Sequence, residues 1–214
     1  MCHRYYVYSS ADIIRYVAQA EKAILRSRMT KALARPMKTE GEVFPTDIVP
    51  VVALSRSGKE TVFPMVWGFR NPRLKTPVFN ARSETASTLP MFKESWKTRR
   101  CAIPCSWYFE WEHLRDSFSG KVSTGDRYSI QASGSSVMFL AGLYRFEDGF
   151  PYFTILTMDS VGSIRFIHDR MPVVLPASLV SSWISLSSDA SSILSRALTD
   201  MVFEKVADSD TLRA

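Results

Sequence analysis

Apolar positions early in the chain recur at the spacing of a helix. Ser10 or Asp12 can cap this helix, because their side-chain oxygens accept hydrogen bonds from backbone N–H groups of a first turn. The apolar positions that carry the pattern are Ile13, Ile14, Val17, Ala18, Ile24 and Leu25. The pattern predicts a helix that ends near the basic stretch 26–38.

Runs of Val, Ile and aromatic residues follow, and these predict strands. Residues 48–54 and 61–67 are separated by a polar turn, which indicates a hairpin. Further strands are predicted at 100–103, 106–111, 127–132, 137–144 and 152–158. The segment 133–136 predicts a second hairpin between 127–132 and 137–144, and Glu147-Asp148-Gly149 turns into the next strand. Short turns between neighbouring strands imply an antiparallel sheet.

Short helices are predicted around this sheet, and they do not alternate with the strands. They lie at 83–89, 89–96, 177–183 and 188–201. The economical interpretation is one α+β domain over residues 1–214. Its C-terminal part, 176–214, is expected to hold helical and strand segments and to fray at 208–214.

The composition excludes several classes of protein. The chain has 214 residues, of which 46% are hydrophobic and 22% charged, enough for a real core. Three Cys and three His are too few for a disulfide framework or a closed zinc site, so no metal and no cofactor are expected. Residues 1–6 lack the apolar region of a signal peptide, and no charge-free stretch predicts a membrane span. A cytoplasmic monomer without membrane contact is expected.

Basic residues are concentrated in the first half of the chain. The net charge is +6, but residues 1–100 carry 18 Lys and Arg against 8 Asp and Glu, whereas residues 101–214 carry 9 against 13. Aromatic residues are interleaved with the bases between Arg70 and Arg100. Such a segment can follow a phosphate backbone while its aromatics stack on bases, or it can be a solvated basic face.

Cys2 is the first candidate for chemistry. Removal of Met1 would leave an α-amine and a thiol on adjacent carbons, with reference pKa values of about 8 and 8.5. The amine can condense with an aldehyde to an imine, and the thiol can close on the imine carbon to form a thiazolidine. A buried, inert Cys in a first strand is the alternative.

Three polar motifs offer further candidates. Asn80 and Arg82 lie in the turn-like segment 79–85, where they can orient a reacting group and grip a phosphate, or cap a helix. Glu110 stands between two aromatics, either as an exposed strand residue or as a desolvated acid with a raised pKa. His168 lies in a compact charged turn and suits proton transfer, whereas His113 is interpreted as a loop residue.

Together these motifs resemble the SRAP family, the SOS response-associated peptidases. The resemblance rests on Cys2, the segments 80–85, 109–111 and 168–172, and the supporting pieces 43–46, 67–69, 141–144 and 154–157, in matching order. It covers residues 1–175 and implies an α+β domain with a β-barrel-like antiparallel core flanked by short helices. It also implies covalent capture of abasic sites in single-stranded DNA through the N-terminal cysteine.

The resemblance assigns roles residue by residue. It implies Cys2 as nucleophile, Asn80 as its positioning amide, and Glu110 and His168 as proton carriers. The DNA contacts and pocket residues that it implies are Arg4, Pro45, Trp67, Arg82, Met91, Trp111 and Thr157. His3 stands where the family usually has Gly, and Glu42 stands where Asn often precedes the Pro-Thr turn.

Two other functions remain open at this point. Cys2, Glu110 and His168 also suit a cysteine peptidase of the N-terminal-nucleophile kind that processes its own leader. Alternatively, Cys2 is inert and the chain is a non-catalytic binder of single-stranded DNA.

Overall fold

The computed structural model describes residues 2–8, 10–115 and 120–207. The strands in chain order are β1 (Arg4–Val7), β2 (Gly41–Val43), β3 (Ile48–Leu54), β4 (Glu60–Trp67), β5 (Asn80–Arg82), β6 (Arg100–Cys105), β7 (Trp107–Arg115), β8 (Val122–Ala132), β9 (Met138–Glu147), β10 (Phe150–Asp159), β11 (Arg170–Pro172), β12 (Val174–Leu175) and β13 (Met201–Val206). The helices are α1 (Ala11–Glu21), α2 (Ile24–Leu33), α3 (Ser83–Ala86), α4 (Pro90–Thr98), α5 (Val180–Ile184) and α6 (Ala190–Leu194), with 3-10 turns η1 (Gly162–Ile164) and η2 (Ala177–Leu179).

Five strands close into a barrel. Strand β4 pairs with β3, β3 with β6, β6 with β9 and β9 with β10, and β10 returns to β4. The hairpin β3–β4 and the turn from β9 into β10 lie where the sequence predicts them, and Asp148 and Gly149 both have positive φ, as a tight hairpin turn requires. The closing pair β4–β10 is parallel, so the barrel is antiparallel except at its seam. The predicted α+β fold with a barrel-like core is confirmed.

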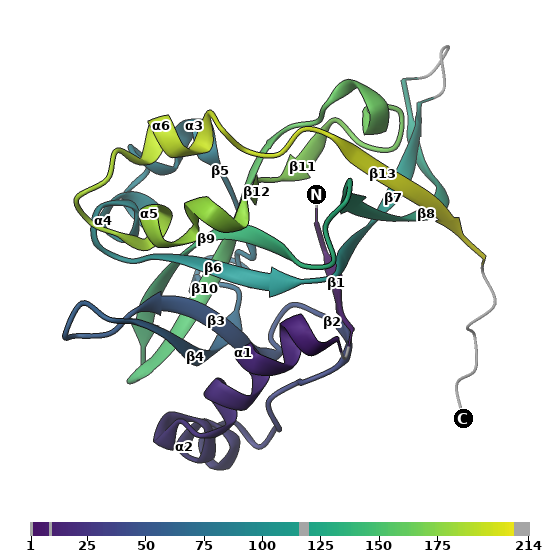
Figure 1. Ribbon diagram of the computed structural model, residues 1–214. Helices are drawn as coiled ribbons and strands as arrows, with labels where there is room; N and C mark the ends of the chain where they lie inside the picture. Colours follow the sequence, from purple (N-terminus) through teal and green to yellow (C-terminus); the bar gives the residue numbers. More distant parts are fainter. Residues whose placement is uncertain (1, 9, 116–119, 208–214) are drawn as a thin grey trace.

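A second sheet leans away from the barrel on the right of Figure 1. Its strand order is β13-β8-β7-β1-β2, and every pairing in it is antiparallel. This sheet brings the N-terminal strand β1 against the first residues of β7, the strand that carries Glu110.

The predicted hairpin between 127–132 and 137–144 is wrong. Strand β8 pairs with β7 and β13 in the open sheet, whereas β9 pairs with β6, β10 and β12 in the barrel. The short turn at 133–136 therefore carries the chain from one sheet to the other. Local turn residues indicate a reversal of direction, but they do not specify which partner a strand finds.

The helices cover the outside of the barrel. The first begins where Ser10 Oγ accepts a hydrogen bond from Ile13 N. The single helix predicted through Leu25 is wrong in extent, because α1 ends at Glu21 and a separate helix, α2, runs from Ile24 into the basic stretch. Figure 1 shows α1 and α2 below the barrel and α3 to α6 beside it. The helix predicted over 188–201 is wrong in extent, because only α6 forms there and Met201 already begins β13.

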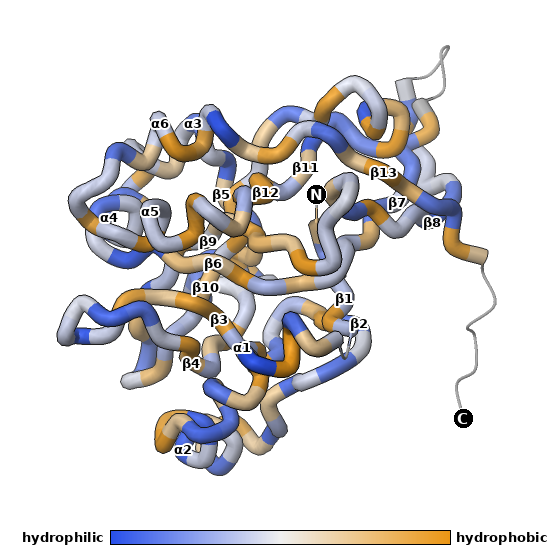
Figure 2. Tube along the Cα trace, in the orientation of Figure 1, coloured by the Kyte–Doolittle hydropathy of each residue, from blue (hydrophilic) through white to orange (hydrophobic). Residues whose placement is uncertain are grey.

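Apolar side chains fill both the barrel and the space beneath its helices. Figure 2 shows the hydrophobic segments following β3, β6, β9 and β10. Cys2, Tyr5 and Trp67 belong to the cluster between the barrel and the open sheet, and all three are fully buried. Among the described residues, no helix is long and apolar enough to cross a membrane. The tail predicted to fray at 208–214 lies outside the described residues.

Candidate functional site

Cys2, Asn80 and Glu110 converge from three distant parts of the chain. Strand β5 is held parallel to β10, with Asn80 opposite Ile155, and this pairing brings the Asn80 amide to the N-terminal segment. Asn80 Nδ2 donates a hydrogen bond of 2.9 Å to the carbonyl oxygen of Cys2. Antiparallel pairing places Arg4 opposite Phe109, so Glu110 lies beside the start of β1.

The Cys2 side chain is fully buried. Its Sγ–H group points to the carbonyl oxygen of Arg4 at 3.6 Å. Burial raises the pKa of the Cys2 thiol, and the charge of Glu110 raises it further. The resting side chain is therefore a protonated thiol.

Glu110 is the desolvated acid of the two alternatives that the sequence leaves open. Its residue is 3% exposed, and burial raises the pKa of its carboxyl group above the ordinary value. Its Oε1 accepts a long hydrogen bond of 3.4 Å from the backbone N–H of Trp111. A carboxyl with a raised pKa holds its proton closer to neutral pH, as a general acid must.

The Asn80 side chain also carries a hydrogen-bond acceptor that no described residue uses. Its Oδ1 is buried and accepts no hydrogen bond from any described residue. A buried acceptor without a donor costs free energy, so its presence beside Cys2 indicates a place for a donor from a ligand.

His168 lies with the two other histidines of the chain. Its ring centroid is 4.0 Å from that of His113. Burial is the largest cause that lowers the pKa of His168, to about 4, so the ring is neutral at pH 7. His113 itself lies in β7, and its interpretation as a loop residue is wrong.

The neutral His168 ring is oriented by the residues that follow it. Its Nδ1 accepts a hydrogen bond of 2.9 Å from the backbone N–H of Arg170. The Asp169 carboxylate also lies 2.8 Å from Nδ1, where it can accept a hydrogen bond from a protonated Nδ1 once the ring is charged. In the resting state Nδ1 accepts from the Arg170 N–H, because the lowered pKa favours the neutral ring.

Arg170 is a buried anchor that sequence reasoning did not assign. Its guanidinium donates to both carboxylate oxygens of Glu84, at 2.8 and 2.9 Å, and to Asp159 at 2.5 Å. It also donates to the carbonyl oxygen of Thr157 at 2.7 Å. These bonds tie the turn of His168 to β10 and α3, which follows Arg82 directly.

A cation–π cluster forms the rim beside Trp111. The Arg4 guanidinium lies 4.6 Å from the Phe44 ring centre and 5.1 Å from that of Trp111. Glu42 accepts from Arg4 at 3.4 Å and also forms an ion pair with Arg127. The candidate phosphate contact Arg4 is thus already matched by a carboxylate.

The other residues implied as DNA contacts differ in accessibility. Arg82 is exposed, and Met91, Pro45 and Trp111 are half-buried. Trp67 and Thr157 are fully buried, and Trp67 Nε1 donates to the Phe79 carbonyl at 2.9 Å. A ring held in the core does not stack on a strand at the surface, so the structure does not bring Trp67 or Thr157 into contact range by their side chains.

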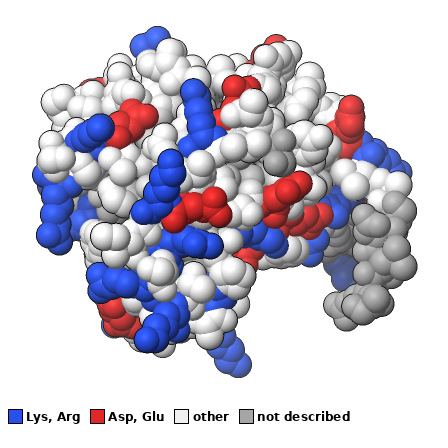
Figure 3. Space-filling model, turned by 60° about the horizontal axis from the view of Figure 1, so that its bottom comes forward, with Lys and Arg blue, Asp and Glu red and all other residues white. Residues whose placement is uncertain are grey.

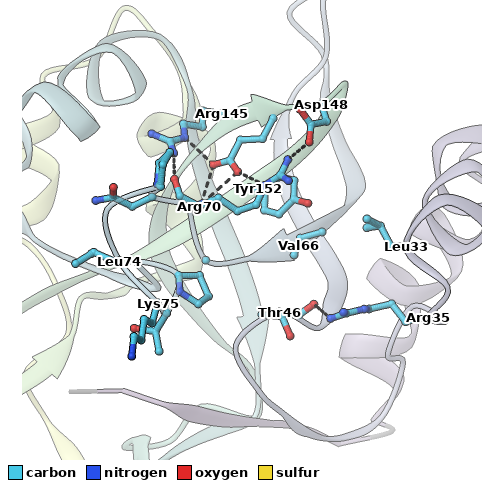
Figure 4. A pocket seen from close by; sticks show the side chains of 16 residues that line it. Leu33, Arg35, Thr46, Val66, Arg70, Leu74, Lys75, Arg145, Asp148 and Tyr152 are labelled. Carbon is cyan, nitrogen blue, oxygen red and sulfur yellow. Dashed lines mark hydrogen bonds and ion pairs between the residues drawn. The ribbon is translucent and has the colours of Figure 1, made fainter.

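Figure 4 shows a large cavity with a different set of lining residues. Its volume is about 770 Å³, and its walls come from α2, the end of β4, the loop 70–77 and the β9–β10 turn. Within it, Glu147 accepts from Arg70 Nε at 2.9 Å and from Arg145 Nε at 2.8 Å. None of Cys2, Asn80, Glu110 and His168 lines this cavity.

The arrangement around Cys2 provides nucleophilic and proton-transfer groups. In the described part of the chain, no group of three or more His, Cys, Asp or Glu side chains is placed to hold a metal ion. The buried groups can exchange protons with a bound molecule and can exclude water from it.

Comparison with known proteins places these motifs in a family context. The family model described as "SOS response associated peptidase (SRAP)" matches residues 1–209. The abasic site processing protein YoaM of Bacillus subtilis is 32% identical over 129 residues, which are 56% of this chain and 54% of that protein. The abasic site processing protein YedK of Escherichia coli is 31% identical over 128 residues, 56% of this chain and 53% of that protein. The matched stretch therefore spans about half the length of these relatives.

Solved structures share the fold. A protein from Bacteroides thetaiotaomicron superposes with a TM-score of 0.71 at 19% identity, covering 97% of this chain and 93% of that one. A phage-related protein from Bordetella bronchiseptica gives a TM-score of 0.71 at 22% identity, covering 97% and 95%. At these identities the likeness concerns the fold alone.

Proposed function

Since the chain belongs to the SOS response associated peptidase family, we propose that it processes abasic sites in DNA by forming a covalent crosslink through Cys2. Its substrate is a single-stranded segment that contains an abasic sugar, and its action shields the lesion as a step of DNA repair. The hydrogen bond from Asn80 Nδ2 to the Cys2 carbonyl carries this proposal, because it fixes the backbone of the nucleophile beside the buried acid Glu110.

The proposed reaction joins the lesion to both nucleophilic atoms of Cys2. After removal of Met1, the free amine of Cys2 attacks the C1′ aldehyde of the ring-opened sugar to give a carbinolamine. Loss of water then gives an imine. The Sγ atom adds to the imine carbon, a C–S bond forms, and the thiol proton ends on the nitrogen of the thiazolidine. The net change is the loss of one water.

Glu110 and His168 are the proton donor and the proton acceptor of this reaction. Glu110, with its raised pKa, supplies the proton to the departing hydroxyl of the carbinolamine. His168 is neutral at pH 7 and accepts the proton that the sugar hydroxyl releases when the ring opens. Asn80 Oδ1, without a donor among the described residues, is available to the carbinolamine or to the amine.

The raised pKa of the Cys2 thiol favours this chemistry over peptide hydrolysis. A cysteine peptidase attacks with a thiolate, which requires a lowered thiol pKa, and the environment of Cys2 acts in the opposite direction. An imine carbon is a stronger electrophile than an amide carbonyl, and the imine nitrogen provides a base for the thiol proton.

Cationic residues at the edge of the site suit a DNA backbone. Arg82 is exposed two residues after Asn80, and Arg4 lies against Trp111 at the rim. Figure 3 shows Lys and Arg over much of the face turned forward, with Asp and Glu interspersed among them. DNA binding is therefore expected to depend on a few placed arginines rather than on one continuous basic face.

Intact mass measurement tests the proposal. The purified protein is incubated with a single-stranded oligonucleotide that carries one abasic site, beside the same oligonucleotide in duplex form. Met1-free protein is expected to gain the mass of the single-stranded oligonucleotide less one water, and to keep it under denaturing conditions. Without a reductant, Cys2→Ala is expected to give no adduct that survives denaturation, because its α-amine alone forms a reversible imine. Cys101→Ala, a change at another fully buried cysteine, is expected to retain the adduct.

A second variant separates the amine from the thiol. Cys2→Ser keeps the α-amine and loses Sγ, so it is expected to form only an imine that is trapped by a borohydride reductant. Met1-free wild-type protein that forms no adduct, or an adduct of equal yield in Cys2→Ala, would overturn the proposal.

A further inference from the structure

Three aromatic side chains form a partly exposed cluster near the β13 edge of the open sheet. Tyr128 in β8, Phe203 in β13 and Phe166, which follows η1, meet edge to face. Their ring centres are 5.6 Å (Tyr128 and Phe166), 5.8 Å (Tyr128 and Phe203) and 5.2 Å (Phe166 and Phe203) apart, within the usual range for aromatic pairs.

Tyr128 packs against the buried core, and the other two rings of the cluster are more exposed. Phe166 is 48% exposed and Phe203 is 39% exposed, so both rings leave much of their surface in water. Exposed aromatics that touch one another beside a polar site form a candidate surface for binding another molecule. The mutual contacts also hold the rings in place, which lowers the entropy that a ligand must remove.

The cluster borders the Cys2 site along two paths. Across the sheet, Tyr128 pairs directly with Glu110, and Phe203 lies one strand further out. Two strand spacings separate β7 from β13, about 10 Å. Along the chain, Phe166 stands two residues before His168.

The chemistry of the cluster suits nucleobases of an unpaired strand. Aromatic side chains bind single strands by stacking, which tolerates any base, and nearby cations contact the backbone. Arg165 is exposed beside Phe166, and Lys205 lies opposite Tyr128, where it pairs with Asp126 at 2.7 Å. A base one or two nucleotides from the reacting sugar falls within this distance of Glu110.

We propose that Phe166, Phe203 and Tyr128 form a stacking site for a nucleobase that flanks the abasic site on one side of the lesion. This inference rests on the proposed function, which supplies the strand. The site is specific for unpaired bases, because the faces of paired bases are covered by their neighbours in a duplex.

Binding of an unreactive probe tests the stacking site. The probe is a single strand with a tetrahydrofuran in place of the abasic sugar, which has no aldehyde and forms no crosslink. Two further probes lack the bases of the three nucleotides on the 5′ side or on the 3′ side. Removing the bases on one side is expected to weaken binding by wild-type protein about tenfold, and removing those on the other side to have a smaller effect.

Leu substitutions remove the aromatic faces and retain apolar contacts. The double variant Phe166→Leu/Phe203→Leu is expected to bind the complete probe about tenfold more weakly and the sensitive base-free probe as wild type does. Phe146→Leu, a change at a 58% exposed ring in β9, is the matched control and leaves all affinities unchanged. Phe166→Trp keeps an aromatic face at this position and is expected to retain the preference of wild-type protein for the complete probe over the base-free probe.

Three results would overturn the stacking site. The first is equal affinity of the double variant and wild type for the complete probe. The second is an equal loss with base-free probes. The third is a molar mass from light scattering that doubles with concentration for wild-type protein but stays that of a monomer for Phe203→Leu. This result would show that the cluster joins two copies of the chain. Failure of wild-type protein to crosslink the aldehyde-bearing strand would instead overturn the proposed function, and the unreactive probe distinguishes the two.

Discussion

The centre around Cys2 and the cavity beside Arg70 differ in almost every physical property. The centre is small and buried, and its groups have shifted pKa values. The cavity is large and open, and the side chains of Arg70 and Arg145 are satisfied by Glu147 and Asp148. Volume alone would select the cavity, whereas the proposed chemistry rests on the buried groups around Cys2.

The comparison shows that burial changes the acid–base behaviour of side chains more than ion pairing at the surface does. Surface ion pairs are solvated and worth about 1 kcal/mol or less, so they change the chemistry of their members little. Burial changes the balance between charged and neutral forms, and it raises the pKa of Cys2 and Glu110 while it lowers that of His168. Four changes, taken from the largest expected effect to the smallest, test this contrast.

Glu110→Gln is expected to slow crosslinking by about 10²- to 10⁴-fold, because it removes the proton donor from the buried centre. The rate is measured in a single turnover with the abasic oligonucleotide in excess. Glu112→Gln, at a half-buried residue of the same strand, is the control and is expected to react as wild type does. Equal slowing by both changes would contradict a specific role for the buried acid.

His168→Gln is expected to alter how the free energy of unfolding depends on pH. The folded pKa of His168 is about 4 and the ordinary value is 6.5, so the unfolded chain takes up this proton first as the pH falls. Stability due to the neutral ring is present above pH 6.5 and is lost as the pH falls through about 4. Urea unfolding between pH 4 and 7 is expected to show a shallower decline for the variant than for wild type.

The exposed ring of His113 supplies the control for this experiment. His113→Gln keeps the buried His168 and is expected to retain most of the decline. A wild-type profile that matches that of His168→Gln over the whole range would show that this ring does not lose its proton on folding.

Glu42→Gln is expected to tighten binding of the unreactive single-stranded probe by up to about fivefold. The change releases Arg4 from its ion pair and leaves the cation to the phosphate backbone. The slope of log K against log salt is expected to steepen by about 0.7, the value for one more phosphate contact on a single strand. Affinity measured at several salt concentrations checks both, and weaker binding would show that Glu42 supports the rim.

Arg70→Ala is expected to have the smallest effect, less than about twofold on crosslinking rate and on probe affinity. Arg70 lies in the large cavity, where Glu147 and Asp148 already neutralise it. The same single-turnover and binding measurements apply. A fall in crosslinking rate comparable to that of Glu110→Gln would show that the cavity takes part in the reaction and would contradict the difference between the two regions.

Local patterns predicted much of the fold and named the four candidate catalytic residues. The hairpin of β3 and β4 follows from its Val-rich runs and polar turn, and Cys2 and Glu110 stood out by their chemistry. What depends on distant contacts was not predictable. The partners of β8 and β9, the parallel seam of β4 with β10 and the contact of His113 with His168 are set by tertiary packing.

Trp67 and Arg170 show the same limit for single side chains. An aromatic residue in a basic region suits both a stacking surface and a core, and the burial of Trp67 decides for the core. Arg170 stands in a charged turn, but its partners Glu84 and Asp159 come from other parts of the chain. Burial and pairing of this kind are properties of the folded chain.

The pairing of β1 sets a time limit on maturation during synthesis. Strand β1 is held between β2 and β7, and Cys2 is fully buried in the completed fold. Strand β7 begins at Trp107, roughly a hundred residues after Cys2. At a synthesis rate of about 5–20 residues per second, the N-terminus stays accessible for roughly 5–20 s. Under the proposed mechanism, an aminopeptidase that acts in this interval meets the chain before β1 pairs with β7, so the rate of translation influences what fraction of molecules carries a free Cys2 amine.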